Sequence, residues 1–248
     1  VKEKNADAFV SMGNTAAVVF ISKRVLGTLN GVDRPALALL VPTLKGLTLL
    51  IDVGANANCL PHHLEQFAAM GQAFMESILG LRNPRIGLMS IGEESTKGNE
   101  LTKEAFERIQ SSSLNFIGNI ESKDIFSGKA DVIVSDGFTG NVALKASEGM
   151  VETLFSLVRR EIMKNVLARI GFFLMNRNLK RIYKKLDYSE YGGAHLLGID
   201  GICIIGHGRS DRNAVKNAVR VAKELVTKKV KERIQQSLGR AKPGPDGI

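Results

Sequence analysis

The chain has 248 residues, of which 44% are hydrophobic and 24% charged, and it carries a formal net charge of +9 at pH 7. A chain of this size can bury a full core as one large domain or two small ones, but no apolar run approaches the roughly 20 residues of a membrane-spanning helix. Nucleic-acid binding is disfavoured too, since no helix-turn-helix or RNP-like motif accompanies the charge and three tyrosines without tryptophan offer few stacking platforms.

Apolar runs typical of buried strands alternate with helical patterns along the chain. After an opening strand at residues 8–10, strands are predicted at residues 36–41, 47–53, 85–91, 114–118, 131–134 and 201–206. Helices are predicted at residues 61–79, 100–110, 141–166 and 211–238. This alternation predicts an α/β fold in which helices cover both faces of a mainly parallel sheet, in three Rossmann-like layers.

The two ends of the chain differ from this pattern. Residues 1–240 are expected to form a single α/β catalytic domain, and residues 241–248, rich in Pro and Gly, a disordered tail. The chain starts with Val1 and enters a strand almost at once, so we expect it to be an N-terminally incomplete fragment or a processed form. Cys59 and Cys203 lie far apart and match no metal-binding spacing, which suits a reducing compartment.

Positive charge is concentrated in residues 159–185, which hold nine basic residues and one acid, Glu161. The segment is predicted to form an amphipathic hairpin, residues 159–186, with two helices joined near an uninterrupted apolar run. That run consists of Phe172, Phe173, Leu174 and Met175. Packing across a dimer interface would explain its apolar faces without lipid, but not the cations around an apolar tip. We therefore expect a dimer contact at the base and docking of the tip on an anionic membrane surface.

Five polar turns, rich in Gly, Asn, Asp and Ser, each follow a predicted strand. They are residues 11–15 (SMGNT), 52–56 (DVGAN), 92–99 (GEESTKGN), 136–141 (DGFTGN) and 206–211 (GHGRSD). Any one of them could be only a turn or a helix cap, but ligands of α/β sheets bind beyond the carboxyl ends of strands, where five turns can converge on one crevice. None matches a Walker loop or a GxGxxG dinucleotide fingerprint. The expected ligand is inorganic phosphate or a small phosphorylated group.

The same turns carry a resemblance to a known family. Matching segments recur in order over almost the whole chain: residues 13–15, 33–38, 52–56, 97–103, 115–119, 136–141, 188–194 and 207–208. In these motifs the chain resembles PlsX-type phosphate acyltransferases, whose fold is similar to those of isopropylmalate dehydrogenase and phosphotransacetylase. Members of that family begin with further βα units that are absent here, which agrees with the expectation of an N-terminally incomplete chain.

The resemblance implies transfer of a fatty acyl group from acyl carrier protein to inorganic phosphate, giving acyl phosphate for phospholipid synthesis. It also implies a homodimer without metal or cofactor, cytoplasmic and peripherally associated with the inner face of the cell membrane. The product would pass to a membrane glycerol-3-phosphate acyltransferase. Two alternatives stay open: a phosphotransacetylase or nicotinamide-dependent enzyme of similar fold, and an inactive, truncated membrane-binding fragment.

The reaction needs a cation and hydrogen-bond donors around phosphate and the thioester carbonyl. Lys97 is the best cation, and Asn141 offers an amide to phosphate or to the developing oxyanion; the resemblance implicates both in catalysis. Without the family resemblance, the sequence would indicate only a solvated loop lysine at position 97 and a helix N-cap at Asn141. Further residues expected to contact phosphate are Asn14, Thr15, Asn56, Asn99 and His207.

Other titratable residues have simpler interpretations. His62 and His63 follow Pro61 at a helix start, where surface positions explain them. Glu93 and Glu94 are expected to hold Lys97 rather than to form a carboxylate pair.

Overall fold

The computed structural model describes residues 1–186, 188–208 and 210–240, and within them eight strands form one sheet. The strands are β1 (Phe9–Ser11), β2 (Ala36–Thr43), β3 (Gly46–Ile51), β4 (Ile86–Met89), β5 (Phe116–Ile120), β6 (Val132–Val134), β7 (Ala194–Leu197) and β8 (Cys203–Ile205). The α-helices are α1 (Thr15–Leu26), α2 (Pro61–Leu79), α3 (Glu100–Gln110), α4 (Gly137–Ile162), α5 (Val166–Leu186), α6 (Arg212–Thr227) and α7 (Val230–Arg240). Two short 3₁₀ turns, η1 (Ser122–Asp124) and η2 (Tyr188–Tyr191), complete the order.

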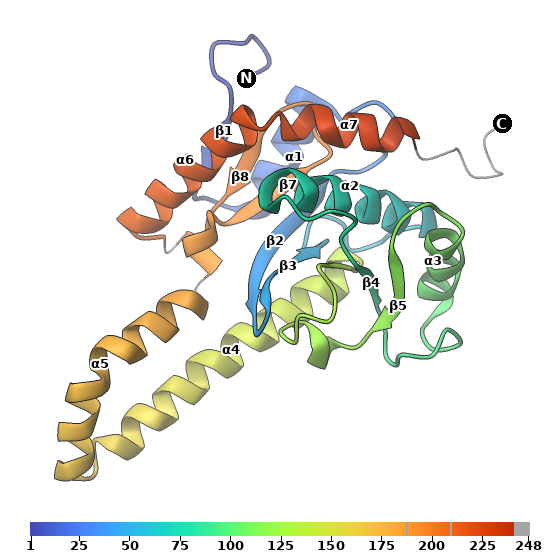
Figure 1. Cartoon of the computed structure of the whole chain (residues 1–248). Helices are drawn as coiled ribbons and strands as arrows, with labels where there is room; N and C mark the ends of the chain where they lie inside the picture. The colour runs from blue at the N-terminus through green and yellow to red at the C-terminus, as the bar shows by residue number, and fades with distance from the viewer. Residues whose placement is uncertain (187, 209, 241–248) are drawn as a thin grey trace.

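The sheet is mixed and mostly parallel, with the strand order β1-β8-β7-β2-β3-β6-β4-β5 (Figure 1). Parallel pairs join β3, β6, β4 and β5 on one side and β1 with β8 on the other. Between these two groups lie three antiparallel pairs, β8–β7, β7–β2 and β2–β3. An odd number of reversals means that β1 and β8 run opposite to β3, β6, β4 and β5.

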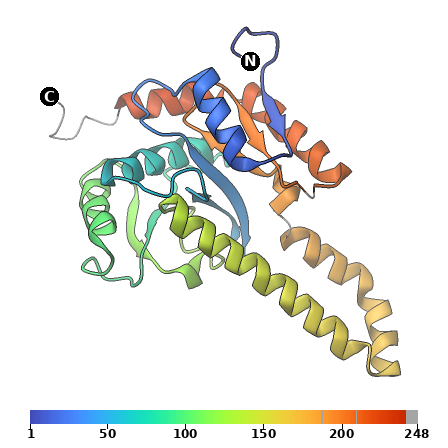
Figure 2. The same cartoon turned by 180° about the vertical axis from the view of Figure 1, so that it is seen from behind.

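Helices cover both faces of the sheet, as Figures 1 and 2 show from opposite sides. One core joins buried side chains of β2, β3, β4 and β6 to α2, α3, α6 and α7, with Phe67 and Phe74 of α2 fully enclosed. The other joins the alternate residues of the same strands to α1 and α4. Strand side chains point alternately to the two faces, so the continuous apolar runs of β2 and β3 reflect burial on both sides.

The longest helix, α4, leaves the body of the molecule with α5 as a two-helix arm (Figures 1 and 2). Residues 163–165 join the two helices, so the prediction of a joint near residues 172–175 is wrong: those residues lie inside α5. The end of the arm carries Leu167, and Phe173 and Leu174 follow within two turns. These three side chains are 78%, 77% and 74% exposed. Within the described part of the chain, no helix is both long and apolar enough to cross a bilayer.

Three further details differ from the sequence prediction. The four-residue strand β7 was not predicted, and the single helix expected at 211–238 is broken between α6 and α7, where Lys229 adopts a positive φ. Helix α4 begins at Gly137 and not at Asn141. The tail expected at residues 241–248 lies outside the described residues.

A buried histidine on β7 gives the fold an expected pH dependence. His195 is 0% exposed, packs against Phe74 with ring centroids 5.0 Å apart, and has no hydrogen-bond partner at either ring nitrogen among the described residues. Burial lowers the pKa of His195 from 6.5 to about 4. Between these two values the unfolded chain binds more protons than the folded one, so the free energy of unfolding falls as the pH drops through this range.

We expect His195→Leu to be about as stable as the parent protein at pH 7, because an apolar side chain replaces unpaired nitrogens. At pH 4.5 the variant should be more stable by roughly 2–3 kcal/mol, since it has no imidazole to protonate. Urea unfolding followed by circular dichroism at the two pH values measures the difference. Stability curves that run parallel with pH would show that His195 is not the responsible group.

Candidate active site

The turn that follows β3 is built around one buried carboxylate. Asp52 accepts hydrogen bonds from the backbone N–H groups of Leu37, Gly54, Ala55 and Asn56, at 2.8–3.0 Å. Burial raises the pKa of the Asp52 carboxyl group, and the donors of Ala55, Asn56, Leu37 and Gly54 act against that rise by stabilising the anion. Asp52 therefore fixes the shape of the turn.

The first turn of α4 packs directly onto this Asp52 turn. A Cβ atom on Gly140 would collide with the Asp52 carbonyl oxygen, and one on Gly137 would lie 2.7 Å from the Asn56 carbonyl oxygen. The Gly137 N–H donates to that same oxygen at 2.8 Å. The glycines in this motif therefore allow a helix start to approach a strand end more closely than any side chain permits.

Asn141 lies where these two turns meet. It is exposed, and its side chain is 3.7 Å from the position of a Cβ atom on Gly54. The N-cap of α4 is Asp136, which accepts from the Thr139 N–H at 2.9 Å, so the interpretation of Asn141 as a cap is wrong. Because Asn141 lies one turn inside the helix, only its side-chain amide is available to a ligand.

The turn after β4 contributes Lys97, an exposed residue whose side chain packs across Gly92. The expectation that Glu93 and Glu94 hold Lys97 is not met. Glu93 pairs instead with Lys129 at 2.9 Å, and this hydrogen bond lowers the pKa of Glu93. Within the described ranges no ion pair involves Lys97, so its ammonium group is free to meet an anion.

A residue outside the predicted site positions the Lys97 loop. Asn119, at the end of β5, is 3% exposed and donates from Nδ2 to the Glu94 carbonyl oxygen at 2.8 Å. The Lys97 N–H donates to that same oxygen at 3.0 Å, and the Ser90 hydroxyl donates to the Lys97 carbonyl oxygen at 3.3 Å. Asn119 belongs to one of the family-like segments, but its sequence gave no reason to separate it from an ordinary strand residue.

Two of the predicted phosphate ligands already have structural roles. Asn56 donates from Nδ2 to both the Pro35 carbonyl oxygen and the Asp52 carboxylate, at 2.8 Å each. Asn99 caps α3, accepting from the Thr102 N–H at 2.9 Å. Both residues lie beside the candidate site, but their amides are largely engaged.

Asn14, Thr15 and His207 lie in a second group of turns. The turns after β1 and β8 adjoin each other, since the Gly206 N–H donates to the Ser11 carbonyl oxygen at 2.8 Å. Both strands run opposite to β3, β4 and β6, so these turns lie at the other end of the sheet, where the amino ends of β3, β4 and β6 are. The predicted convergence of all five turns in one crevice at the same end of the sheet is therefore not observed. Asn14 caps α1 by accepting from the Ala17 N–H at 3.1 Å.

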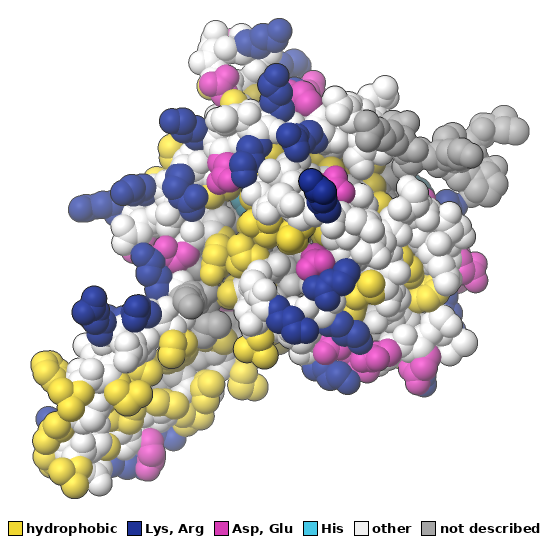
Figure 3. All heavy atoms as spheres, viewed as in Figure 1, with side chains coloured by type: hydrophobic (Ala, Val, Ile, Leu, Met, Phe, Trp, Pro, Cys, Tyr) yellow, Lys and Arg dark blue, Asp and Glu magenta, His cyan; other side chains and the backbone are white. Residues whose placement is uncertain are grey.

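A large groove along α4 reaches both groups of turns. Its volume is about 2460 Å³, and it is bordered by Asn99 near the first group and by His207 near the second. Between them its lining is largely apolar, with side chains from α4, from β3 and from the loops beside them. These include Leu44, Leu47, Phe126, Phe138 and Val142. In Figure 3, apolar side chains gather along the arm and continue onto the body of the molecule.

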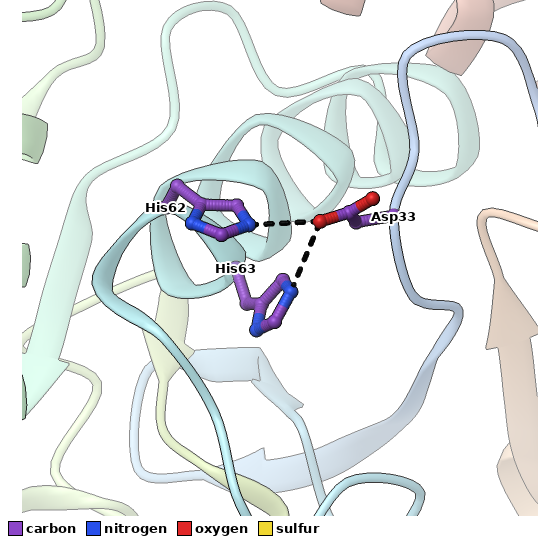
Figure 4. A group of neighbouring side chains, drawn as sticks. All are labelled: Asp33, His62 and His63. Atoms are coloured by element: carbon purple, nitrogen blue, oxygen red, sulfur yellow. Dashed lines mark hydrogen bonds and ion pairs between the residues drawn. The ribbon is translucent and has the colours of Figure 1, made fainter. Parts of the chain in front are cut away.

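Asp33, His62 and His63 form a cluster with the residue types of a metal site (Figure 4). Hydrogen bonds to the ring nitrogens of His63, however, are not compatible with metal binding there. The Asp33 carboxylate lies 2.9 Å from His62 Nε2 and 3.3 Å from His63 Nε2, and the His62 hydrogen bond lowers the pKa of Asp33. The Leu60 N–H donates to His63 Nδ1 at 2.8 Å, so the proton of the neutral ring is on Nε2, which then cannot bind a metal. His63 is only 2% exposed, so the expectation of a surface position is wrong.

The fold is similar to those of solved phosphotransacetylases. The Streptococcus pyogenes enzyme superposes with a TM-score of 0.57 at 16% identity, over 96% of this chain and 65% of that one. A Staphylococcus aureus phosphotransacetylase gives 0.54 at 14% identity, over the same shares. At this identity the likeness defines the class of fold: an α/β fold of the phosphotransacetylase type.

The sequence comparison is more specific. A family model described as "Fatty acid synthesis protein" matches residues 1–233. A phosphate acyltransferase from Thermodesulfovibrio yellowstonii is 51% identical over 96% of this chain and 69% of its own length, and one from Acidobacterium capsulatum is 50% identical over 95% and 70%. The chain thus belongs to this family of acyltransferases, and it spans about 70% of the length of these relatives.

Proposed function

We propose that the chain transfers a fatty acyl group from acyl carrier protein to inorganic phosphate, forming an acyl phosphate for phospholipid synthesis. The observation that carries the proposal is Lys97, which is exposed and has no ion pair among the described residues, in the turn after β4. Asn141 and the Asp52 turn follow the neighbouring parallel strands β6 and β3, and a groove with a largely apolar lining lies next to these turns. The names of the relatives support phosphate as the acyl acceptor. The apolar groove supports a long acyl chain on the donor.

In the proposed reaction, Lys97 and Asn141 hold phosphate beside the thioester carbonyl. A phosphate oxygen attacks the carbonyl carbon to form a C–O bond, and collapse of the tetrahedral intermediate breaks the C–S bond. The electron pair leaves with the sulfur as a thiolate, which takes a proton from solvent. A thiolate is a good leaving group, so no general acid is needed. His207, which borders the groove near the second group of turns, therefore has no part in this proposed step.

The arm suggests where this reaction occurs. Its exposed apolar side chains at Leu167, Phe173 and Leu174 stand among cations such as Lys164, Arg169 and Arg177. An exposed apolar surface of this kind favours an interaction site, and the surrounding charge favours an anionic membrane. We propose a dimer contact at the base of the arm and docking of its end on the inner face of the cell membrane, where a glycerol-3-phosphate acyltransferase would receive the product.

The test is formation of acyl phosphate by the purified chain. Palmitoyl-acyl carrier protein and phosphate are incubated with it, and the product is trapped with hydroxylamine while free thiol is measured in parallel. Phosphate-dependent hydroxamate together with thiol release is expected from the carrier-protein thioester. Absence of phosphate-dependent product with any thioester contradicts the proposal, and product from acetyl coenzyme A alone favours a phosphotransacetylase.

A further inference from the structure

The solvent-facing side of α6 carries an unusual mixture of cations and small apolar residues. Six of its exposed residues share one face of the helix, at spacings of three and four: Arg212, Val215, Lys216, Val219, Arg220 and Lys223. Val215 and Val219 are 41% and 54% exposed. We call this set the α6 face; in Figure 3 dark-blue Lys and Arg side chains gather over the helix. The opposite side of α6, with Ala218 and Val221, is buried in the core.

Most of the charge on the α6 face has no close carboxylate partner among the described residues. In the described part of the chain, Arg212, Lys216 and Lys223 take part in no ion pair, and Arg220 has only a long one, at 3.9 Å, to Glu224. Cations just beyond the face behave differently: Lys228 pairs with Glu224 at 2.7 Å and Lys231 with Asp200 at 3.0 Å. The α6 face therefore offers positive charge to an external partner.

The position of the α6 face ties it to the candidate active site. The residues just before and within the first turn of α6 border the groove, among them His207, Ser210, Asp211 and Asn213. From Arg212 to Lys223 the face then extends for about 17 Å, at 1.5 Å per residue. A partner bound along the helix would have one end at the rim of the groove.

We propose that the α6 face docks an acidic surface of the protein that carries the acyl donor, and this inference rests on the proposed function. Complementary charge raises association rates and fixes orientation, and the two valines supply a small apolar contact between the cations. Lipid insertion calls for bulkier side chains, and a nucleic-acid surface calls for aromatic platforms, neither of which this face has. The acyl group, carried on a flexible linker of the bound protein, would enter the groove near His207.

The test compares the full chain with the double variant Lys216→Glu, Lys223→Glu. For the carrier-protein thioester we expect KM to rise at least tenfold with kcat nearly unchanged, and the effect to shrink in high salt, because exposed charges are screened. Turnover of the same acyl group on coenzyme A should not change. The matched control Lys2→Glu, Arg82→Glu alters the net charge equally at exposed positions outside α6 and should leave KM for the carrier protein unchanged.

Binding is also measured without turnover, by fluorescence anisotropy of labelled carrier protein. Weaker binding by the α6 variant alone supports the docking site even if no acyl phosphate forms, in which case only the proposed reaction fails. Equal binding by the parent chain, the α6 variant and the control overturns the docking site, even if acyl phosphate is made. Loss of binding to anionic vesicles with unchanged carrier-protein binding also overturns it, in favour of a lipid surface.

Discussion

Replacing Lys97 by alanine is expected to lower turnover about a hundredfold, equivalent to about 3 kcal/mol of transition-state stabilisation. In the described part of the chain Lys97 has no ion pair, and its turn follows β4, the strand next to the one that leads to Asn141. Its loss should therefore leave phosphate and the developing oxyanion without their cation. Since the side chain is exposed, the fold should be unaffected. The measurement is kcat for phosphate-dependent hydroxamate formation, with circular dichroism as the check on folding.

Three variants make this prediction specific. Lys97→Arg keeps the charge with a different geometry and should retain an intermediate rate. Asn141→Ala should lose somewhat less than Lys97→Ala. Arg82→Ala removes an exposed cation before the amino end of β4, whereas Lys97 follows the carboxyl end of that strand. This variant should be as active as the parent chain. If folded Lys97→Ala turns over at a near-parental rate, Lys97 has no catalytic role.

Replacing both Phe173 and Leu174 by glutamate is expected to abolish binding to vesicles that contain anionic lipid. The two side chains are 77% and 74% exposed, so their loss should not disturb the core, but two carboxylates cannot enter a lipid interface and are repelled by its charge. Catalysis on carrier-protein substrate should remain largely intact, because α5 lies away from the turns around Lys97. Vesicle co-sedimentation measures binding.

The control for the arm is Phe20→Glu, Ile21→Glu on α1, where two apolar side chains are similarly exposed, at 67% and 57%. This variant should bind vesicles as the parent chain does. Neutralising Arg177 and Lys180 should weaken binding gradually, by about 1 kcal/mol for each charge near the surface. Co-sedimentation unchanged by the Phe173 and Leu174 substitutions would leave only the dimer role for the arm.

The elements with strong periodicity could be predicted from the sequence, and those decided by long-range pairing could not. The spacing of Leu64, Phe67 and Met75 gave α2 its bounds, because one face of that helix must be buried. Strand β7 was missed, since its four residues follow two glycines, Gly192 and Gly193, and resemble a loop until β2 and β8 pair with them. The arm was predicted, but its turn was placed in the apolar run, while the chain reverses at residues 163–165.

The candidate site was predicted as a set of residues and not as an arrangement. The polar turns could be recognised because Gly, Asn and Asp recur after five predicted strands, but nothing local encodes strand direction. The three antiparallel pairs around β2 and β7 separate Asn14 and His207 from Lys97 and Asn141. The burial of His63 and the role of Asn119 likewise depend on neighbours far away in the sequence.

The length of α4 has a mechanical consequence. The helix is continuous from Gly137 to Ile162, and its first turns are held to the body by the close contact between Gly140 and the Asp52 turn and by the packing of Ala143 and Leu144. At 1.5 Å per residue, Ile162 lies about 33 Å from that contact and Asn141 only about 1.5 Å from it. A tilt of about 5° around Gly140 therefore moves the far end by about 3 Å and Asn141 by about 0.1 Å, on the same helix geometry. The far end of the arm can therefore move by several ångströms to follow an uneven surface, while the side-chain amide of Asn141 stays in place.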